Sequence, residues 1–232
     1  MLREEFKSRI FTPGSFLTES TLEDMKGVYV PFWLYDYKAR YDYAGKGTKV
    51  RVWTSGDTEY TETSFYRVER DMDIDFDKIP VDASIAMPND VMDLMEPFDY
   101  GQMEGFEESY MSGFCGEIYN MNAEELEERA KTRADADAEA LMKETLAGYT
   151  TLIPERKDLR MDREAAHFAL LPVWQYLYRY QGKEYVFHVN GQSGKISGST
   201  PVSVKKVLAY GSTVFAALWI LLSCVAGILE VL

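Results

Sequence analysis

The sequence predicts an α+β protein: an antiparallel sheet of two related aromatic hairpin units with one long helix, followed by a single C-terminal transmembrane helix. Three observations predict this class. Aromatic and β-branched residues gather in strand-like runs, residues 123–146 are rich in strong helix formers, and residues 207–229 carry no charge. Hydrophobic residues make up 46% of the 232 residues, enough for one sizeable core or two small ones.

The N-terminal part is expected to hold two short helices. Residues 2–10 predict an amphipathic helix that ends at the Pro13–Gly14 turn. Ser20 then caps a brief helix at 21–26, with Glu23 as its capping-box partner. The N-terminus is charged and lacks the apolar core of a signal peptide, so nothing directs it across a membrane.

A strand meander follows. An aromatic strand is predicted at 28–43, a turn at 45–47, a returning strand at 49–54, a second turn at 55–57 and a further strand at 58–68. From Asp71 to Asp77 polar and apolar residues alternate strictly, which is the period of a half-buried strand. Four aspartates at alternate positions also resemble a calcium loop. Phe76 stands where that loop needs glycine and Asp82 where it needs glutamate, so the strand is favoured.

The middle of the chain is strongly acidic. Between Asp71 and Glu127 there are 16 acidic residues and one base, Lys78. A helical turn or two is expected near 89–96, and then an irregular aromatic stretch. Acids spaced between aromatics indicate a solvated outer face over a packed inner one; the alternative is a docking surface for a basic protein partner. The formal charge of −13 opposes contact with phosphate backbones and anionic headgroups, so nucleic-acid binding is not expected.

One long helix is predicted at 123–146, capped by Asn122 and closed by Gly148. Its apolar positions are mostly small and recur in steps of three to five, so the helix is expected to pack closely against a sheet. These positions are Leu126, Ala130, Ala134, Ala138, Leu141 and Leu146. Strands are then predicted at 150–153, 159–164, 168–180, 183–190 and 195–198, with turns at Gly182 and Asn190–Gly191.

Two aromatic stretches repeat each other. Residues 30–37 and 171–178 share Pro, Trp, Tyr and Tyr at the same offsets. The structural interpretation is two related hairpin units in which Trp33 and Trp174 are equivalent. The functional alternative is an aromatic cleft for a small ligand, formed by Trp33, Tyr35, Trp174 and Tyr176. Aromatic stripes on strands lie more often in a core, so the structural interpretation is favoured.

The uncharged residues 207–229 predict a transmembrane helix. As a helix they span roughly 35 Å, enough to cross a hydrocarbon core of about 30 Å. Lys205 and Lys206 precede the run and Glu230 follows it, so the positive-inside rule places the preceding residues in the cytoplasm. We therefore expect a soluble acidic domain at 1–204 and a single-pass anchor in the cell membrane at 205–232. The anchoring residues are Val207, Leu208, Val214, Phe215, Leu218, Trp219, Ile220, Leu221, Leu222, Val225, Ile228 and Leu229.

No catalytic or metal-binding residues stand out, and no cofactor is expected. His167 and His188 have no Cys or His at ligand spacing. Residues 191–195 resemble a phosphate loop only superficially, because two residues separate the glycines where four are required. Two hypotheses follow. One is a membrane-tethered cytoplasmic interaction or scaffold module without enzymatic activity, with the lipid bilayer as a partner. The other is a small-ligand sensor or an enzyme that uses the aromatic cleft.

Five stretches taken together resemble one known family. They are GVYVPFWLYD at 27–36, IPVDAS at 79–84, MEPFDY at 95–100, SGF…EIYNMNAEE at 112–125 and LPVW…YRYQGKEYVFHVNGQSGKISGSTPVS at 171–203. The chain is similar to uncharacterised bacterial membrane proteins, common in Firmicutes, that usually begin with a short zinc ribbon and are often labelled primosomal protein N-prime or helicase-like. The resemblance implies fold and location rather than activity. This chain has no Cys-x-x-Cys pair and no Walker loop, so neither the ribbon nor the helicase label is carried over.

Overall fold

The described residues of the chain fold into two compact units. The computed structural model describes residues 10–14, 25–199 and 201–229. The long-hairpin unit comprises residues 30–87 and 117–170, and the short-hairpin unit comprises the described residues of 1–29, 88–116 and 171–232. The described strands form a sheet in the order β2-β1-β4-β5-β6, with β3 beside β1. Together with its helices this confirms the α+β class. The helices expected at 2–10 and 21–26 fall almost entirely outside the described residues.

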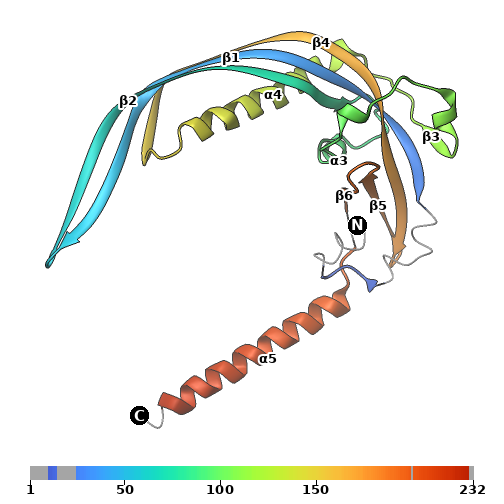
Figure 1. Cartoon of the computed structure of the whole chain (residues 1–232). Coiled ribbons are helices and arrows are strands. Elements are labelled where there is room, and N and C mark those ends of the chain that lie inside the picture. The colour runs from blue at the N-terminus through green and yellow to red at the C-terminus, as the bar shows by residue number, and fades with distance from the viewer. Residues whose placement is uncertain (1–9, 15–24, 200, 230–232) are drawn as a thin grey trace. The chain divides into compact units, whose positions relative to one another are not determined.

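The long-hairpin unit is built on two long antiparallel strands, β1 (Lys26–Ser55), which enters the unit at residue 30, and β2 (Thr58–Asp82) (Figure 1). The turn between them contains Gly56, whose φ of 62° favours glycine. The turn predicted at 45–47 is wrong, because β1 runs through these residues without a break. A Cβ atom on Gly45 would lie 2.7 Å from the Ile153 carbonyl oxygen, and one on Gly47 would lie 2.7 Å from a ring carbon of Tyr149. Both glycines therefore serve close approach between segments instead of a turn.

The alternating stretch in β2 forms the half-buried strand that its period predicts. Met72, Ile74 and Phe76 are partly buried and pack against the core clusters of this unit. The aspartates between them, at 71, 73, 75 and 77, are exposed. Because successive side chains of a strand point to opposite faces, this alternation gives the sheet one apolar inner face and one acidic outer face.

Helix α4 (Ala123–Thr145) covers the inner face of the long-hairpin unit (Figure 1). Its N-terminus is held by a capping box. The Asn122 side chain accepts a hydrogen bond from the Glu125 N–H at 2.9 Å, and the Glu125 carboxylate accepts one from the Asn122 N–H at 2.8 Å. The cap predicted at Asn122 is confirmed, and the helix ends within one residue of the predicted 146.

Small side chains let α4 lie close to the sheet. Ala130 and Ala134 are fully buried in one core cluster, and Ala138 is fully buried in the next. Leu141 was expected on this face, but it is 40% exposed and Met142 is buried instead. Residues four apart lie nearly on one line along an α-helix, and 142 continues the steps of four that run through 126, 130, 134 and 138.

Ion pairs fasten α4 to the strands. Arg163 of β4 lies 2.9 Å from the Glu127 carboxylate, and Lys157 lies 2.9 Å from Glu139. On the opposite side of the helix Arg129 lies 2.8 Å from Asp82, whose side chain is completely buried. A buried carboxylate needs such a partner, since removing one member of a buried pair typically costs about 3–5 kcal/mol.

Strand β4 (Thr151–Tyr180) is a single element where the sequence predicted three. Charged residues at 155–158 and 162–164 made these stretches look like breaks between strands. In the structure their side chains either reach α4, as Lys157 does, or point to the outer face, as Asp158 does in its ion pair with Arg160. The strand continues because its backbone pairs with neighbouring strands, regardless of the polarity of its side chains.

In the short-hairpin unit the end of β4 pairs with β5 (Lys183–Asn190), and β5 pairs with β6 (Ile196–Gly198). Gln181 and Gly182 form the tight turn, both with positive φ. The unit also holds α3 (Asn89–Asp93), the 3-10 helices η3 (Tyr100–Gln102) and η4 (Glu108–Met111), and β3 (Phe114–Gly116). Asn190 organises this region by donating hydrogen bonds to the carbonyls of Met95 at 2.8 Å and Pro97 at 3.0 Å.

The repeated aromatic motif gives two hairpins of the same local geometry, one in each unit. The carbonyl of Pro31 accepts a hydrogen bond from the Ala83 N–H at 2.9 Å, and the carbonyl of Pro172 accepts one from the Gly191 N–H at 2.8 Å. Two residues further along each strand, a tryptophan is paired with a valine: Trp33 with Val81, and Trp174 with Val189. The equivalence expected for the two tryptophans is thus supported by matching register.

Helix α5 (Val204–Leu229) is long and apolar enough to cross a membrane. Its candidate span, Val204–Ser223, is 0% buried, unlike a helix in a protein core. Its first turn is attached to the segment at 10–14. The Ser203 N–H donates to the Phe11 carbonyl at 2.8 Å, and the Lys206 ammonium donates to the Thr12 carbonyl at 2.7 Å. The Phe11 and Tyr210 rings also meet edge to face, with centroids 5.5 Å apart.

Candidate functional site: the charged outer face of the long hairpin

The outer face of the long-hairpin unit carries a dense array of charged side chains. On β1, Lys38, Arg40 and Asp42 point outward and alternate with buried residues, of which Ala39 is the one without a ring. Directly across the β1–β2 ladder these three residues face Asp75, Asp73 and Asp71 respectively. Strand pairing therefore places two bases of β1 opposite aspartates of β2 and sets Asp42 opposite Asp71, with cross-strand side chains about 4.5–5.5 Å apart at Cβ.

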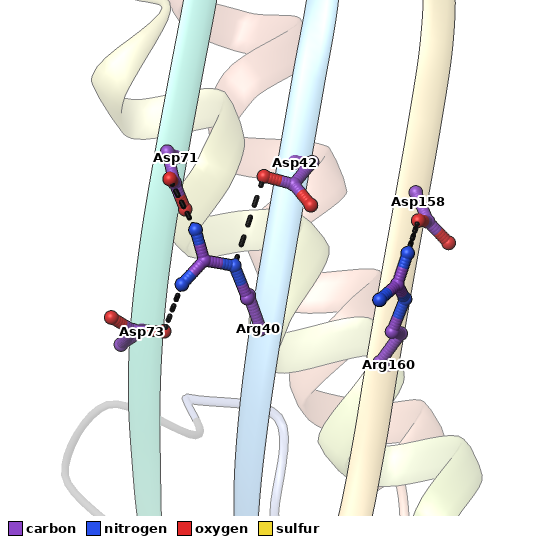
Figure 2. A network of polar contacts seen from close by, with 6 residues as sticks. All are labelled: Arg40, Asp42, Asp71, Asp73, Asp158 and Arg160. Atoms are coloured by element: carbon purple, nitrogen blue, oxygen red, sulfur yellow. Dashed lines mark hydrogen bonds and ion pairs between the residues drawn. The ribbon is translucent and has the colours of Figure 1, made fainter.

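Arg40 lies at the centre of this face, where one guanidinium is shared by three carboxylates (Figure 2). Its nitrogens lie 2.5 Å from Asp71, 3.5 Å from Asp73 and 4.0 Å from Asp42. The side chains of Arg40, Asp71 and Asp73 are 51%, 58% and 80% exposed. Each exposed pair contributes little to stability, roughly 0–1 kcal/mol. What the arrangement provides is a fixed local excess of negative charge.

Other bases on this face are paired with single carboxylates. Lys38 lies 2.7 Å from Glu164 on β4, and Lys46 lies 2.9 Å from Glu155. Beside the Arg40 cluster, Arg160 binds Asp158 at 2.7 Å within β4 (Figure 2). These pairs cancel charge, so the negative excess is concentrated along the aspartate row of β2.

Hydrogen bonds move the pKa values of three groups on this face further from neutral pH. The hydrogen bond with Glu164 raises the pKa of Lys38, and the hydrogen bond with Asp158 raises the pKa of Arg160. At the end of the aspartate row, the hydrogen bond from Lys78 lowers the pKa of Asp77. Each shift favours the charged form. A general acid or base needs a pKa near the working pH, and these groups have pKa values far from it. They are therefore suited to electrostatic recognition instead of proton transfer.

The four residues of the expected aromatic cleft lie in two different units. In the long-hairpin unit the Trp33 indole N–H donates to the Met121 carbonyl at 3.1 Å, and the Tyr35 hydroxyl donates to the Ala123 carbonyl at 2.7 Å. Burial raises the pKa of the Tyr35 hydroxyl. In the short-hairpin unit Trp174 packs edge to face against Phe114, and Tyr176 is buried in the local core. The shared cleft stays a prediction.

The histidines have separate roles within the described structure. His167 is exposed, and its Nε2 lies 3.2 Å from Asp36. His188 is buried, 3.2 Å from the amide nitrogen of Gln175, and burial lowers its pKa. Among residues 10–14, 25–199 and 201–229, no three or more His, Cys, Asp or Glu side chains are grouped so as to hold a metal ion.

The expected anchor residues all belong to α5. Those from Val207 to Leu222 are exposed along the helix, and the Phe215 and Trp219 rings stack with centroids 6.3 Å apart. Val225, Ile228 and Leu229 continue the same helix, and their side chains lie outside the described part of the structure. Surface exposure of so many large apolar groups is what a lipid-facing helix requires.

The sequence did not indicate that Arg40 lies at the centre of the charged face. The available signal was the alternation of Lys38, Arg40 and Asp42 with apolar residues, which places the three on one face of a strand. The sequence did not indicate the strand that lies beside them. The turn expected at 45–47 would have paired them with residues 49–54, whereas in the structure they pair with residues 71–75.

A curated protein is similar to this chain along almost its whole length. The chain is 33% identical over 224 residues to the uncharacterised protein YdjG of Bacillus subtilis (strain 168). The match covers 97% of this chain and 66% of that protein, so the chain spans just under two thirds of its relative. No protein-family profile matches the chain, and no solved structure matches it. The Bacillus origin of this relative agrees with the Firmicutes-type resemblance, and its name shows neither a zinc ribbon nor a primosomal role.

Proposed function

We propose that this chain is a membrane-tethered interaction module without enzymatic activity, whose acidic outer face binds a basic protein partner. In this proposal α5 crosses the cell membrane once and residues 1–204 lie in the cytoplasm. The observation that carries the proposal is the sharing of Arg40 among Asp42, Asp71 and Asp73. This leaves an excess of fixed carboxylates on an exposed sheet face.

The electrostatics of this face suit a basic partner. Strand pairing fixes the backbone spacing of its carboxylates, so the aspartate row presents a regular line of negative charge to a lysine or arginine that approaches it. Such charge complementarity mainly raises the association rate and the specificity. The contacts would lie on an exposed surface, so binding is expected to weaken with salt, with a Debye length of about 8 Å at physiological ionic strength.

The tether rests on the length, apolarity and exposure of α5. Lys205 and Lys206 stand at its start, and a positive flank is retained on the cytoplasmic side. External protease added to sealed spheroplasts should therefore leave residues 1–200 intact. Digestion of this part while the membrane remains sealed would reverse the proposed orientation.

A photo-cross-linking residue at Asp75 tests the docking face in native membranes. Asp75 faces Lys38 across the ladder and is exposed. The expected result is a cross-link to a protein rich in lysine or arginine, lost in the triple variant Asp71→Asn, Asp73→Asn and Asp42→Asn and weakened by added salt. A cross-link that survives neutralisation of the row would show that these carboxylates do not mediate the contact.

The matched control removes the same number of charges elsewhere. Glu104, Glu107 and Glu108 are exposed in the short-hairpin unit, and changing all three to glutamine alters the net charge by the same amount. This variant should keep the cross-link at Asp75. Equal loss in both variants would indicate that net charge, and no particular face, governs the interaction.

The alternative hypothesis, a small-ligand sensor or enzyme, is the weaker proposal. The polar groups of Trp33 and Tyr35 that a ligand would use already donate to backbone carbonyls. A zinc ribbon like that of the family described above is not proposed either, because this sequence contains no Cys-x-x-Cys pair.

A further inference from the structure

The distal part of the long hairpin is a two-stranded ribbon that projects past the start of β4 (Figure 1). The last contacts with the segment before β4 are made at Thr150, whose N–H donates to the Thr48 carbonyl at 2.7 Å and whose hydroxyl accepts from the Val50 N–H at 3.0 Å. Beyond this point every residue from 51 to 63 is exposed. An isolated two-stranded ribbon is only marginally stable in water. A ribbon with large apolar groups on its surface therefore needs another surface to pack against.

The two faces of this ribbon differ. On one face, Trp53 stacks on Tyr60 with ring centroids 5.6 Å apart, and the Arg51 guanidinium lies 5.5 Å from the Trp53 ring. Lys49 lies 5.1 Å from the Tyr149 ring and 5.6 Å from the Tyr66 ring. The aromatic groups on this face are therefore covered in part by one another and by cations.

The opposite face, called here the apolar ribbon face, has no such pairing. Register places eight side chains on it: Thr48, Val50, Val52, Thr54, Glu59, Thr61, Thr63 and Phe65. Seven are uncharged, and the eighth, Glu59, stands at the end beside the turn. Phe65 is 81% exposed and Val52 is 54% exposed. Large apolar side chains exposed to this degree on a strip with one charge, at its end, mark a surface that something covers.

We propose that the apolar ribbon face lies on the surface of the lipid bilayer, with Val50, Val52 and Phe65 entering the headgroup–acyl boundary. The inference rests on the membrane tether proposed above. Eight side chains are too few for a stable protein interface, which needs roughly 20–30 residues on each side. Binding to a bilayer requires far fewer contacting side chains. In the tethered protein α5 holds the ribbon at a high effective concentration relative to the bilayer, so each apolar contact is intramolecular. The absence of bases among the eight also favours the neutral boundary region over an anionic headgroup site.

Spin labels at neighbouring positions on the two faces test this proposal. Thr61 and Glu62 are consecutive in β2, so they lie one strand position apart along the ribbon and on opposite faces. The full chain, with Cys115→Ser and Cys224→Ser, carries one cysteine at a time through Val52→Cys, Thr61→Cys or Glu62→Cys. It is reconstituted into phosphatidylcholine vesicles, and the accessibility of each label to oxygen and to a water-soluble nickel chelate is measured.

Val52 and Thr61 are expected to be accessible to oxygen and to lose access to nickel, whereas Glu62 keeps access to nickel. Nickel access at Val52 equal to that at Glu62 would overturn the proposal, since the face would be in water. Protection of Val52 from both reagents would also overturn it, since protein, a second copy or a partner, would cover the face. Replacing Phe65→Asp in the Val52→Cys background should restore nickel access.

A label at Leu218 separates failure of this inference from failure of the tether. Leu218 lies in the candidate span and is exposed. Lipid access at Leu218 together with water at Val52 would sink the ribbon contact alone. Water at Leu218 would sink the membrane tether, whatever the ribbon does.

Discussion

Replacing Gly45 with alanine distinguishes close strand approach from a turn at this position. Alanine in a β-strand normally gains stability over glycine, by about 0.4–1 kcal/mol, because the unfolded chain has less freedom to lose. Here the added Cβ would lie 2.7 Å from the Ile153 carbonyl oxygen and 3.1 Å from the Pro154 Cα. Ordinary contacts begin near 3.4 Å. Backbone atoms must move, so the sign should reverse.

We expect Gly45→Ala to destabilise the long-hairpin unit by about 1–3 kcal/mol, the usual cost of overpacking. For a chain of this size that corresponds to a fall in melting temperature of roughly 2–12 °C. Thermal unfolding of the full chain in detergent, followed by near-ultraviolet circular dichroism, provides the measurement. Gly105→Ala is the control, because nothing lies within 4 Å of its added Cβ. Unchanged or increased stability for Gly45→Ala would show that the two segments are not in close contact.

Three further predictions address the core, the buried histidine and the membrane helix. Ala134→Leu should cost about 1–3 kcal/mol in urea unfolding, because Ala134 is fully buried between α4 and the sheet, whereas Leu141→Ala should stay within about 0.5 kcal/mol. Burial lowers the pKa of His188 in the folded state, so at a pH below about 6.5, the ordinary histidine pKa, the unfolded state binds more protons than the folded state. The free energy of unfolding should therefore fall as the pH drops from about 7 to 5, and His188→Gln should reduce that fall. Leu218→Lys should weaken membrane insertion by about 2.5–3.5 kcal/mol, seen as protein shifted to the soluble fraction after cell lysis.

Several features of this protein could be predicted because their signals are local. The alternation at 71–77 places Met72, Ile74 and Phe76 on one face of a strand whatever lies beside it. The Asn122–Glu125 capping box needs only four consecutive residues. The apolar run in α5 is recognised by length and lack of charge alone. The repeated Pro and Trp positions also predicted two similar hairpins.

Other features depend on partners that are distant in sequence. Gly45 and Gly47 resemble turn residues, and only the approach of residues 149–154 shows why glycine stands there. The charged stretches of β4 belong to one strand because their backbone finds neighbouring strands.

The candidate site also combines features that the sequence determines locally with features that depend on distant residues. Sequence alone determined that residues 71–77 present four carboxylates on one face of a strand. It also determined that residues 207–229 are apolar enough for a membrane. Only the tertiary structure brought Arg40 to three of the outer-face carboxylates and projected the ribbon beyond β4. The physical reason is range: side-chain periodicity and capping act over a few residues, whereas strand register joins residues tens of positions apart and sets which charges meet.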